Sequence, residues 1–134
     1  MALEPENTFS YPRKEKLKGK KLIEQLFLEG RSVSAYPLKL IYLPSHPFDG
    51  SRIRAGVAVP KKKVQKAVKR NRIKRLLREA YRHNKATIFN NTEGNFAFLI
   101  LYLEKEMPSF NQVDAKMKAL FKKFNTQLHE KNTP

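Results

Sequence analysis

Apolar residues recur along the chain at two spacings, and these spacings separate predicted helices from predicted strands. From about Lys20 to Glu29 they recur at the spacing of one helical face: Leu22, Ile23, Leu26 and Phe27. Gly30 follows and is expected to end this helix in the left-handed conformation. Ser109 and Gln112 have the spacing of a capping box and precede a second amphipathic helix, marked by Val113, Met117, Leu120, Phe121, Phe124 and Leu128.

Three further segments have the pattern of strands. Ser32 to Leu43 alternates in its second half, and Pro37 indicates that the strand begins at a sheet edge. Ile53 to Val59 also alternates, and the turn formers before it predict that these two segments pair as an antiparallel hairpin. Phe96 to Leu103 is apolar throughout, which is typical of a central strand covered on both faces. Residues 90–94, just before it, are expected to form a turn.

A third helix, between the last two strands, has one apolar and one basic side. Its start is expected between about Val64 and Lys69. The apolar side consists of Ile73, Leu76, Leu77 and Ala80, and the opposite side carries Asn71, Arg75, Arg78 and Arg82. The helix therefore buries one stripe of side chains and presents the other.

Positive charge is concentrated in two blocks of the sequence. The formal net charge is +16. Residues 61–85 contain twelve Lys or Arg and one acid, and residues 13–21 contain six basic residues and one acid, so the rest of the chain is neutral. Such blocks create a local positive field that a polyanion would feel, whereas charge that serves solubility alone would be spread more evenly. Nucleic acid is the predicted partner, and a merely solvated helix face is the alternative.

Length and composition predict one domain. The 134 residues are 40% hydrophobic, enough for a single core, and we expect one nucleic-acid-binding domain over residues 11–129 between tails at 1–10 and 130–134. The chain has no Cys, so a disulfide framework and a thiolate metal site are excluded. The longest apolar run is too short to span a membrane. We expect a cytoplasmic protein with no membrane partner.

Residues for protein-borne catalysis are not evident. His46, His83 and His129 lack the spacing to another His or to a carboxylate pair that would hold a metal. The nearest acid cluster, Glu93, Glu104 and Glu106, is better explained as solvated loop residues. We therefore predict neither catalytic residues nor a metal site in the protein.

Several motifs together resemble the signature of the bacterial ribonuclease P protein component. They are Gly56-Val-Ala-Val-Pro-Lys-Lys-Lys63, Ala67, Arg70-Asn-Arg-Ile-Lys-Arg75 and Arg78-Glu-Ala-Tyr-Arg82, and Tyr11-Pro-Arg13, Phe27 and Phe96 to Leu101 extend the resemblance over most of the chain. The resemblance implies an α/β (α+β) two-layer sandwich of order αβββαβα. Its four-stranded sheet would be mostly antiparallel, with the basic helix in a left-handed βαβ crossover, contrary to the general right-handed rule.

The resemblance also implies a function. In that family the protein is an auxiliary subunit, and a catalytic RNA that holds Mg²⁺ removes the 5′ leader from precursor tRNA. Arginine binds phosphate in a bidentate geometry, so we expect contacts to the RNA subunit from Lys62, Lys63, Lys66, Arg70, Asn71, Arg72, Lys74, Arg75, Arg78 and Arg82. Aromatic rings can stack on unpaired bases, so we expect contacts to the leader from Arg13, Lys14, Phe27, Tyr36, Lys39, Tyr42 and Lys61.

Some alternatives remain open at the level of sequence. Core packing is an equal alternative for Phe27 and Tyr42, whereas Tyr36 is the ring expected to be exposed. The family's usual basic residue after the last strand is replaced by Leu103-Glu104, which leaves a phosphate contact there undecided. Neither a cofactor bound by the protein alone nor an obligate protein partner is expected. Other functions would be a ribosomal or ribosome-assembly RNA-binding protein, or a metal-dependent nuclease, which the missing carboxylate cluster disfavours.

Overall fold

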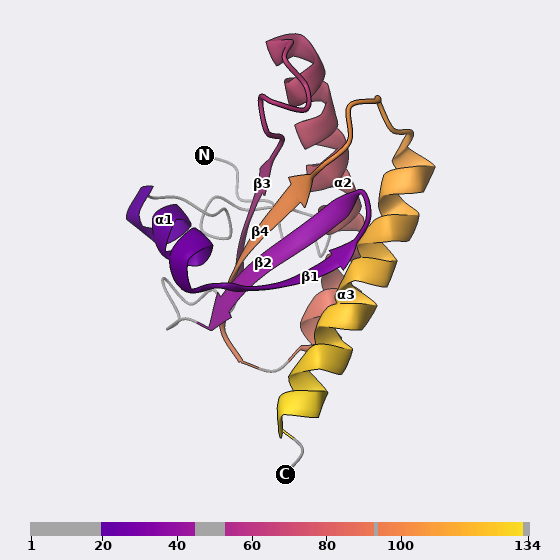
Figure 1. The fold of residues 1–134 in the computed structure, drawn as a ribbon. Helices are drawn as coiled ribbons and strands as arrows, with labels where there is room; N and C mark the ends of the chain where they lie inside the picture. Colours follow the sequence, from indigo (N-terminus) through magenta and orange to yellow (C-terminus); the bar gives the residue numbers. More distant parts are fainter. Residues whose placement is uncertain (1–19, 45–52, 93, 133–134) are drawn as a thin grey trace, which may run out of the picture.

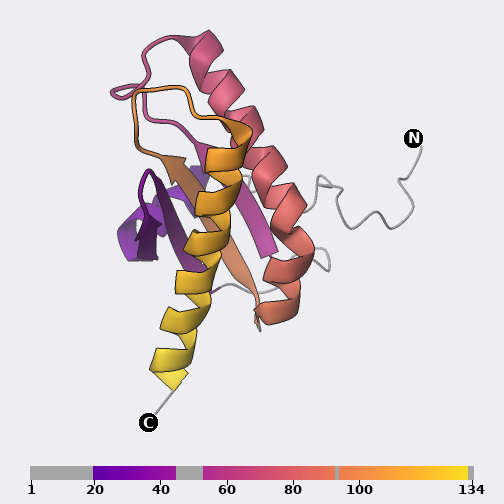
Figure 2. The ribbon, with the colours of Figure 1, turned by 90° about the vertical axis from the view of Figure 1, so that its right-hand side faces the viewer.

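The described part of the chain folds into one four-stranded sheet with helices on both faces (Figures 1 and 2). The structure, a computed structural model, describes residues 20–44, 53–92 and 94–132. The elements in chain order are α1 (Lys20–Glu29), β1 (Arg31–Ala35), β2 (Leu38–Pro44), β3 (Ile53–Ala58), α2 (Ala67–Asn91), β4 (Phe96–Tyr102) and α3 (Phe110–Asn132). The predicted order αβββαβα is confirmed. The predicted tail at 1–10 and most of the turn predicted over residues 44–50 lie outside the described residues. Helix α3 continues through residues 130–132 of the predicted C-terminal tail, and residues 133–134 lie outside the described ranges.

The strands lie in the order β1-β2-β4-β3. β1 pairs antiparallel with β2, β2 antiparallel with β4, and β3 parallel with β4. The predicted hairpin between Ser32–Leu43 and Ile53–Val59 is therefore wrong, because β4 lies between β2 and β3. All seven residues of β4 are buried, and a strand that is apolar on both sides is most stable at the centre of a sheet.

Helix α2 connects β3 to β4 by a left-handed crossover. The two strands are parallel neighbours, and both run upward in Figure 1. Figure 2 views the sheet from the side of α2 and α3, and there β4 lies to the left of β3. A right-handed crossover would place the second strand to the right. The handedness implied by the family resemblance is thus confirmed.

The predicted strand from Ser32 to Leu43 is two strands in the structure. The chain reverses at Tyr36 and Pro37, which are joined by a cis peptide bond, and Ala35 then pairs with Leu38. Pro37 lies in this turn and not at a sheet edge, since β2 has neighbours on both sides. Apolar alternation continues through such a reversal, so it does not reveal the break.

Each face of the sheet has its own apolar cluster. The larger cluster packs α2 and α3 on one face and includes Leu40, Phe98, Ile73, Leu77 and Phe124. The smaller cluster packs α1 on the other face and includes Leu26, Ile41, Ala97, Leu99 and Leu101. Successive side chains of a strand point to opposite faces, so β2 and β4 contribute alternate residues to both clusters. This arrangement leaves the polar side of α2 directed away from the sheet.

The structure differs from the prediction at the end of α1 and at the turn predicted over residues 90–94. Gly30 does not adopt a left-handed conformation; a Cβ there would lie 2.7 Å from Ile41 Cγ2 and 2.3 Å from the Leu26 carbonyl oxygen, so close approach explains this glycine. Helix α2 continues to Asn91, through part of the predicted turn, and Gly94 alone among the described glycines has a positive φ, +96°.

The capping box at the start of α3 has the predicted pair of hydrogen bonds. The Ser109 amide donates to Gln112 Oε1 at 2.9 Å, and the Gln112 amide donates to Ser109 Oγ at 3.2 Å.

Candidate nucleic-acid interface

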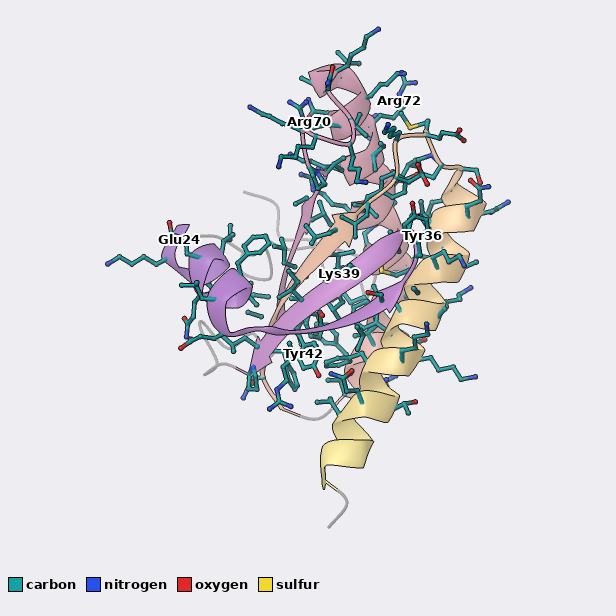
Figure 3. All side chains as sticks on the ribbon, viewed as in Figure 1. Glu24, Tyr36, Lys39, Tyr42, Arg70 and Arg72 are labelled. Atoms are coloured by element: carbon teal, nitrogen blue, oxygen red, sulfur yellow. The ribbon has the colours of Figure 1, made fainter. Side chains whose placement is uncertain are left out.

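The solvent side of α2 is a row of basic side chains on a firmly packed helix. Ile73, Leu77 and Ala80 are fully buried, and Tyr81 is 1% exposed, which fixes the rotation of the helix about its axis. Arg70 and Lys74 are half-buried, and the other predicted contacts on this helix face solvent: Asn71, Arg72, Arg75, Arg78 and Arg82. Figure 3 shows Arg72 projecting at the end of the molecule where α2 begins. The sequence prediction of one buried and one presented side is confirmed.

Arg70 has a structural partner that the sequence did not predict. Its Nη1 donates hydrogen bonds to the carbonyl oxygens of Val64, at 3.1 Å, and Gln65, at 2.7 Å. Val64 is buried, and the amide groups of Lys63 and Val64 both donate to the Pro60 carbonyl oxygen. Arg70 therefore closes the loop before α2 in addition to any contact with RNA.

Lysines surround a depression of about 310 Å³ beside this loop. We call it the lysine depression; it is lined by Lys62, Lys63, Val64, Gln65, Lys66, Lys69 and Lys105. Lys66 is the N-cap residue of α2 and makes no capping hydrogen bond with its side chain. The positive end of the helix dipole therefore adds to the field of the lysines. Lys69 and Lys105 were not predicted as site residues; Lys105 arrives from the loop after β4, which no local pattern reveals.

A second surface lies on the α1 side of the sheet. Phe27 is 58% exposed on α1, so it is not the core residue that its periodicity allowed. Lys39 is half-buried on β2 and pairs with Leu101 of β4, which in turn pairs with Ala58 of β3. Lys39 and Phe27 thus share this side of the molecule, since Leu101 belongs to the cluster under α1.

Tyr42 is a core residue, and its predicted contact with a leader strand is corrected. The side chain is 1% exposed and points to the α3 side of the sheet. Its ring lies edge-on to Phe124, with centroids 4.7 Å apart, and its hydroxyl accepts a hydrogen bond from Gln127. The alternation along β2 places Tyr42 opposite to Lys39, so the two cannot face one ligand.

Tyr36 is exposed as predicted but belongs to a different part of the molecule. It lies in the turn between β1 and β2, on the side of α3, whereas α1 is on the opposite side (Figure 3). Its hydroxyl donates to Glu104 Oε2 at 2.7 Å. This hydrogen bond raises the pKa of Tyr36 and lowers the pKa of Glu104. Lys61 is exposed just after β3, and the predicted contacts Arg13 and Lys14 lie outside the described residues.

The titratable groups between α2 and α3 form a structural network. Asp114 accepts hydrogen bonds from Asn84 Nδ2, at 2.8 Å, and from Lys118 Nζ, at 3.0 Å, and lies 3.2 Å from His83 Nδ1. Burial alone would raise the pKa of Asp114, but the bonds from Lys118, Asn84 and His83 outweigh it, so the pKa is lowered. Within the described ranges, no group of three or more His, Asp or Glu could hold a metal ion. No helix in the same ranges could cross a membrane.

Comparison with known proteins identifies the family. The ribonuclease P family model matches residues 11–125. The ribonuclease P protein component of Porphyromonas gingivalis is 34% identical over 115 residues, 82% of each chain, and that of Chlorobaculum tepidum is 33% identical over 132 residues, 90% of this chain and 86% of the other.

Solved structures give the same result for the fold. The Staphylococcus aureus ribonuclease P protein has a TM-score of 0.66 at 21% identity, covering 81% of this chain and 93% of that one. The Thermotoga maritima protein has a TM-score of 0.64 at 26% identity, covering 81% and 96%. The resemblance seen in the sequence motifs is confirmed, and the chain belongs to the ribonuclease P protein family, whose enzyme is a ribonucleoprotein endonuclease of tRNA processing.

Proposed function

We propose that this chain is the auxiliary protein subunit of ribonuclease P. It binds the catalytic RNA subunit through α2 and the 5′ leader of precursor tRNA through the α1 side of the sheet, and it acts in the cytoplasm. The observation that carries the proposal is the row of exposed Asn71, Arg72, Arg75, Arg78 and Arg82 on a helix whose other side is buried. Family membership favours this function over that of a ribosomal or ribosome-assembly protein.

The α2 row suits a folded RNA backbone. Guanidinium groups spaced three or four residues apart lie on one side of a helix, about 5–6 Å apart at Cβ, so each reaches a separate phosphate. Asn71 both donates and accepts, which suits a ribose or a base edge. Because the opposite side of α2 is packed against the sheet, the row is held in one orientation before binding, which lowers the ordering cost of association.

The leader would bind on the other side of the sheet. Phe27 offers an exposed ring for stacking on an unpaired base, and Lys39 offers an ammonium group to the backbone. Arg13, Lys14 and Lys61 remain candidates for the same strand. Helix α1 and helix α2 lie on opposite faces of the sheet, so leader and RNA subunit would occupy separate surfaces of one small domain.

In this proposal the chemistry belongs to the RNA. Phosphate oxygens of the RNA would hold hydrated Mg²⁺, which lowers the pKa of bound water and supplies hydroxide for cleavage. The protein contributes substrate binding and neutralises phosphate repulsion, so its effect should be largest when Mg²⁺ is scarce.

Incubation of the purified chain with labelled precursor tRNA, with and without a bacterial ribonuclease P RNA, tests the proposal. We expect no cleavage by the protein alone and faster cleavage by the RNA at low Mg²⁺ when the protein is added. Metal-dependent cleavage by the protein alone would identify a protein nuclease instead. Failure to affect the RNA at any Mg²⁺ concentration would favour an RNA-binding protein with no role in cleavage.

A further inference from the structure

Two depressions meet at the loop between β4 and α3. Glu104 and Lys105 are consecutive in this loop, and each lines a different depression. Lys105 lines the lysine depression at the start of α2. Glu104 lines a second depression of about 340 Å³, which we call the Tyr36 pocket and which lies between the β1–β2 turn and the start of α3. Both are separate from the exposed row on α2 and from the α1 side of the sheet.

The Tyr36 pocket combines apolar walls with carboxylate acceptors. Its walls include the 62% exposed Tyr36 ring, Pro37, Met107 and Pro108. Glu104 and Glu106 supply the carboxylates, and Gln112 and Lys116 of α3 also line the pocket, so it carries both acceptors and donors. A flat ligand with hydrogen-bond donors on its edge fits this combination, since small-molecule sites are mostly apolar with a few placed polar groups.

Glu104 is held in place between the two depressions. Tyr36 donates to its Oε2 at 2.7 Å, and the Lys105 amide donates to its Oε1 at 2.8 Å. Lys63 and Lys105 also help to lower the pKa of Glu104, which places the ammonium groups of the lysine depression within electrostatic reach of the pocket. The surface therefore changes within a few side chains from an aromatic pocket of mixed charge to a depression lined by lysines.

Lys105 is a candidate for the phosphate contact after the last strand that the sequence left undecided. Leu103 and Glu104 stand where a basic residue was expected after the last strand. The next residue, Lys105, lines the lysine depression together with Lys62, Lys63 and Lys66, which come from a loop about forty residues earlier in the chain. The five lysines that line this depression outnumber the neighbouring Glu104 carboxylate, and clustered like charge is unfavourable without further counterions, so this depression is suited to a phosphate.

We propose that these two depressions together bind one unpaired nucleotide of the RNA partner, with its base in the Tyr36 pocket and a flanking phosphate in the lysine depression. The proposal rests on the proposed function and assigns Tyr36 to this nucleotide instead of the leader surface. The base stacks on the Tyr36 ring, and Glu104 and Glu106 accept hydrogen bonds from its exocyclic amino group. Cytosine, adenine and guanine carry such a group and uracil does not, so the site discriminates against uracil.

Nuclear magnetic resonance titration of the full chain separates the base from the phosphate. The probes are CMP, UMP and inorganic phosphate at constant ionic strength. We expect inorganic phosphate to shift the signals of the lysine depression alone. CMP should shift these and also the Met107 methyl and Tyr36 ring signals, with an affinity about fivefold or more above that of UMP. CMP shifts confined to the lysines would overturn the proposal.

Matched variants test the residues. Tyr36→Ala removes the ring and should weaken CMP binding about tenfold, and Lys105→Gln should weaken CMP and inorganic phosphate alike. Glu104→Gln should reduce the preference for CMP over UMP. Lys122→Gln is the control, because Lys122 is an exposed lysine of α3 that lines neither depression. Equal affinity of Tyr36→Ala and Lys122→Gln for CMP would contradict the base assignment.

The same variants distinguish failure of this inference from failure of the proposed function. Affinity for ribonuclease P RNA should fall in Arg72→Ala whether or not the nucleotide site exists. If Arg72→Ala loses affinity while Tyr36→Ala and Lys105→Gln do not, the function stands and the nucleotide site is wrong. If none of the three loses affinity, the proposed RNA partner itself is wrong. Thermal unfolding of each variant checks that the fold is intact.

Discussion

The guanidinium of Arg70 lies 2.7 Å from the carbonyl oxygen of Gln65, with which it closes the loop that leads into α2. Arg70 sits two positions from Arg72, whose side chain faces solvent, whereas the Arg70 side chain is turned toward its own backbone. Two arginines of one motif therefore have different structural environments.

Replacement of Arg70 by Ala should lower the free energy of unfolding more than replacement of Arg72. Arg70→Ala removes hydrogen bonds from a charged donor to two carbonyl oxygens, so we expect a loss of about 1–2 kcal/mol in the free energy of unfolding. Arg72→Ala changes an exposed side chain and should stay within about 0.5 kcal/mol. Urea unfolding of both variants in the absence of RNA measures the difference. Identical midpoints would mean that the Arg70 bonds add nothing.

Salt dependence should report the phosphate contacts of α2. If Arg72, Arg75 and Arg78 each neutralise a phosphate, log K plotted against log salt has a slope of about −0.7 to −0.9 per contact. Each Arg→Ala change should reduce the magnitude of that slope by roughly one unit while the fold is kept. Affinity for ribonuclease P RNA across a salt series provides the measurement. Variants that keep the parental affinity and slope would show that the row is only a solvated face.

Buried residues of the same helix should behave in the opposite way. Ile73 and Leu77 are 0% exposed, so Ile73→Ala or Leu77→Ala should cost about 2–5 kcal/mol of stability. Val68, on the same helix, is 73% exposed, and Val68→Ala is the control, with an expected change within about 0.5 kcal/mol. Thermal or urea unfolding distinguishes them. A small effect at both buried positions would contradict the packing of α2 described above.

Phe27 should contribute to binding of the 5′ leader and not to binding of the mature part of the tRNA. Phe27→Ala removes an exposed ring, and loss of one stacked base costs about 1–3 kcal/mol of binding. Binding of precursor tRNA by the holoenzyme should weaken by that amount, whereas mature tRNA, which lacks the single strand, should bind unchanged. Leu28→Ala is the control, since Leu28 is 84% exposed on the same helix. Equal weakening for both tRNAs would place Phe27 outside the leader surface.

Acid should weaken the contact between α2 and α3. The pKa of Asp114 is lowered from 3.8 in the folded state, so its contribution to stability is present above that value and is lost as the pH falls through the lowered one. Asp114→Asn should therefore be less stable than the parent at pH 5, and the difference should shrink as the pH falls below 3.8. Urea unfolding at pH 5 and at a series of lower pH values tests the sign. A difference that grows on acidification would contradict the assigned network.

Local sequence patterns predict where helices and strands lie better than they predict which strands pair with each other. The bounds of α1 and the central place of β4 follow from periodicity and from an apolar run that needs cover on both faces. The pairing of β3 with β4 does not follow from periodicity, because β4 lies about forty residues further along the chain and β2, which is nearer to β3, has a similar pattern. Strand neighbours depend on the three-dimensional competition for the sheet centre.

The candidate site shows the same division. The presented side of α2 follows from helix geometry and was predicted residue by residue. Tyr42 was misplaced because the alternation along β2 does not say which face carries the larger core. Lys105 and the second role of Arg70 were missed because both depend on a loop meeting a distant or irregular segment. Tyr36 was correctly predicted to be exposed but is on the other side of the molecule from Phe27.

The central position of β4 also constrains the order in which the protein can assemble as it leaves the ribosome. The β1–β2 hairpin is local and can form early, but β3 pairs, within the described residues, with β4 alone. Until residues 96–102 have been synthesised, β3 and the apolar stripe of α2 have no complete sheet to pack against. Such non-local closure slows folding. In the nascent chain the most basic segment, residues 61–85, is therefore exposed before the core can form, and a polyanion can bind this segment before folding is complete.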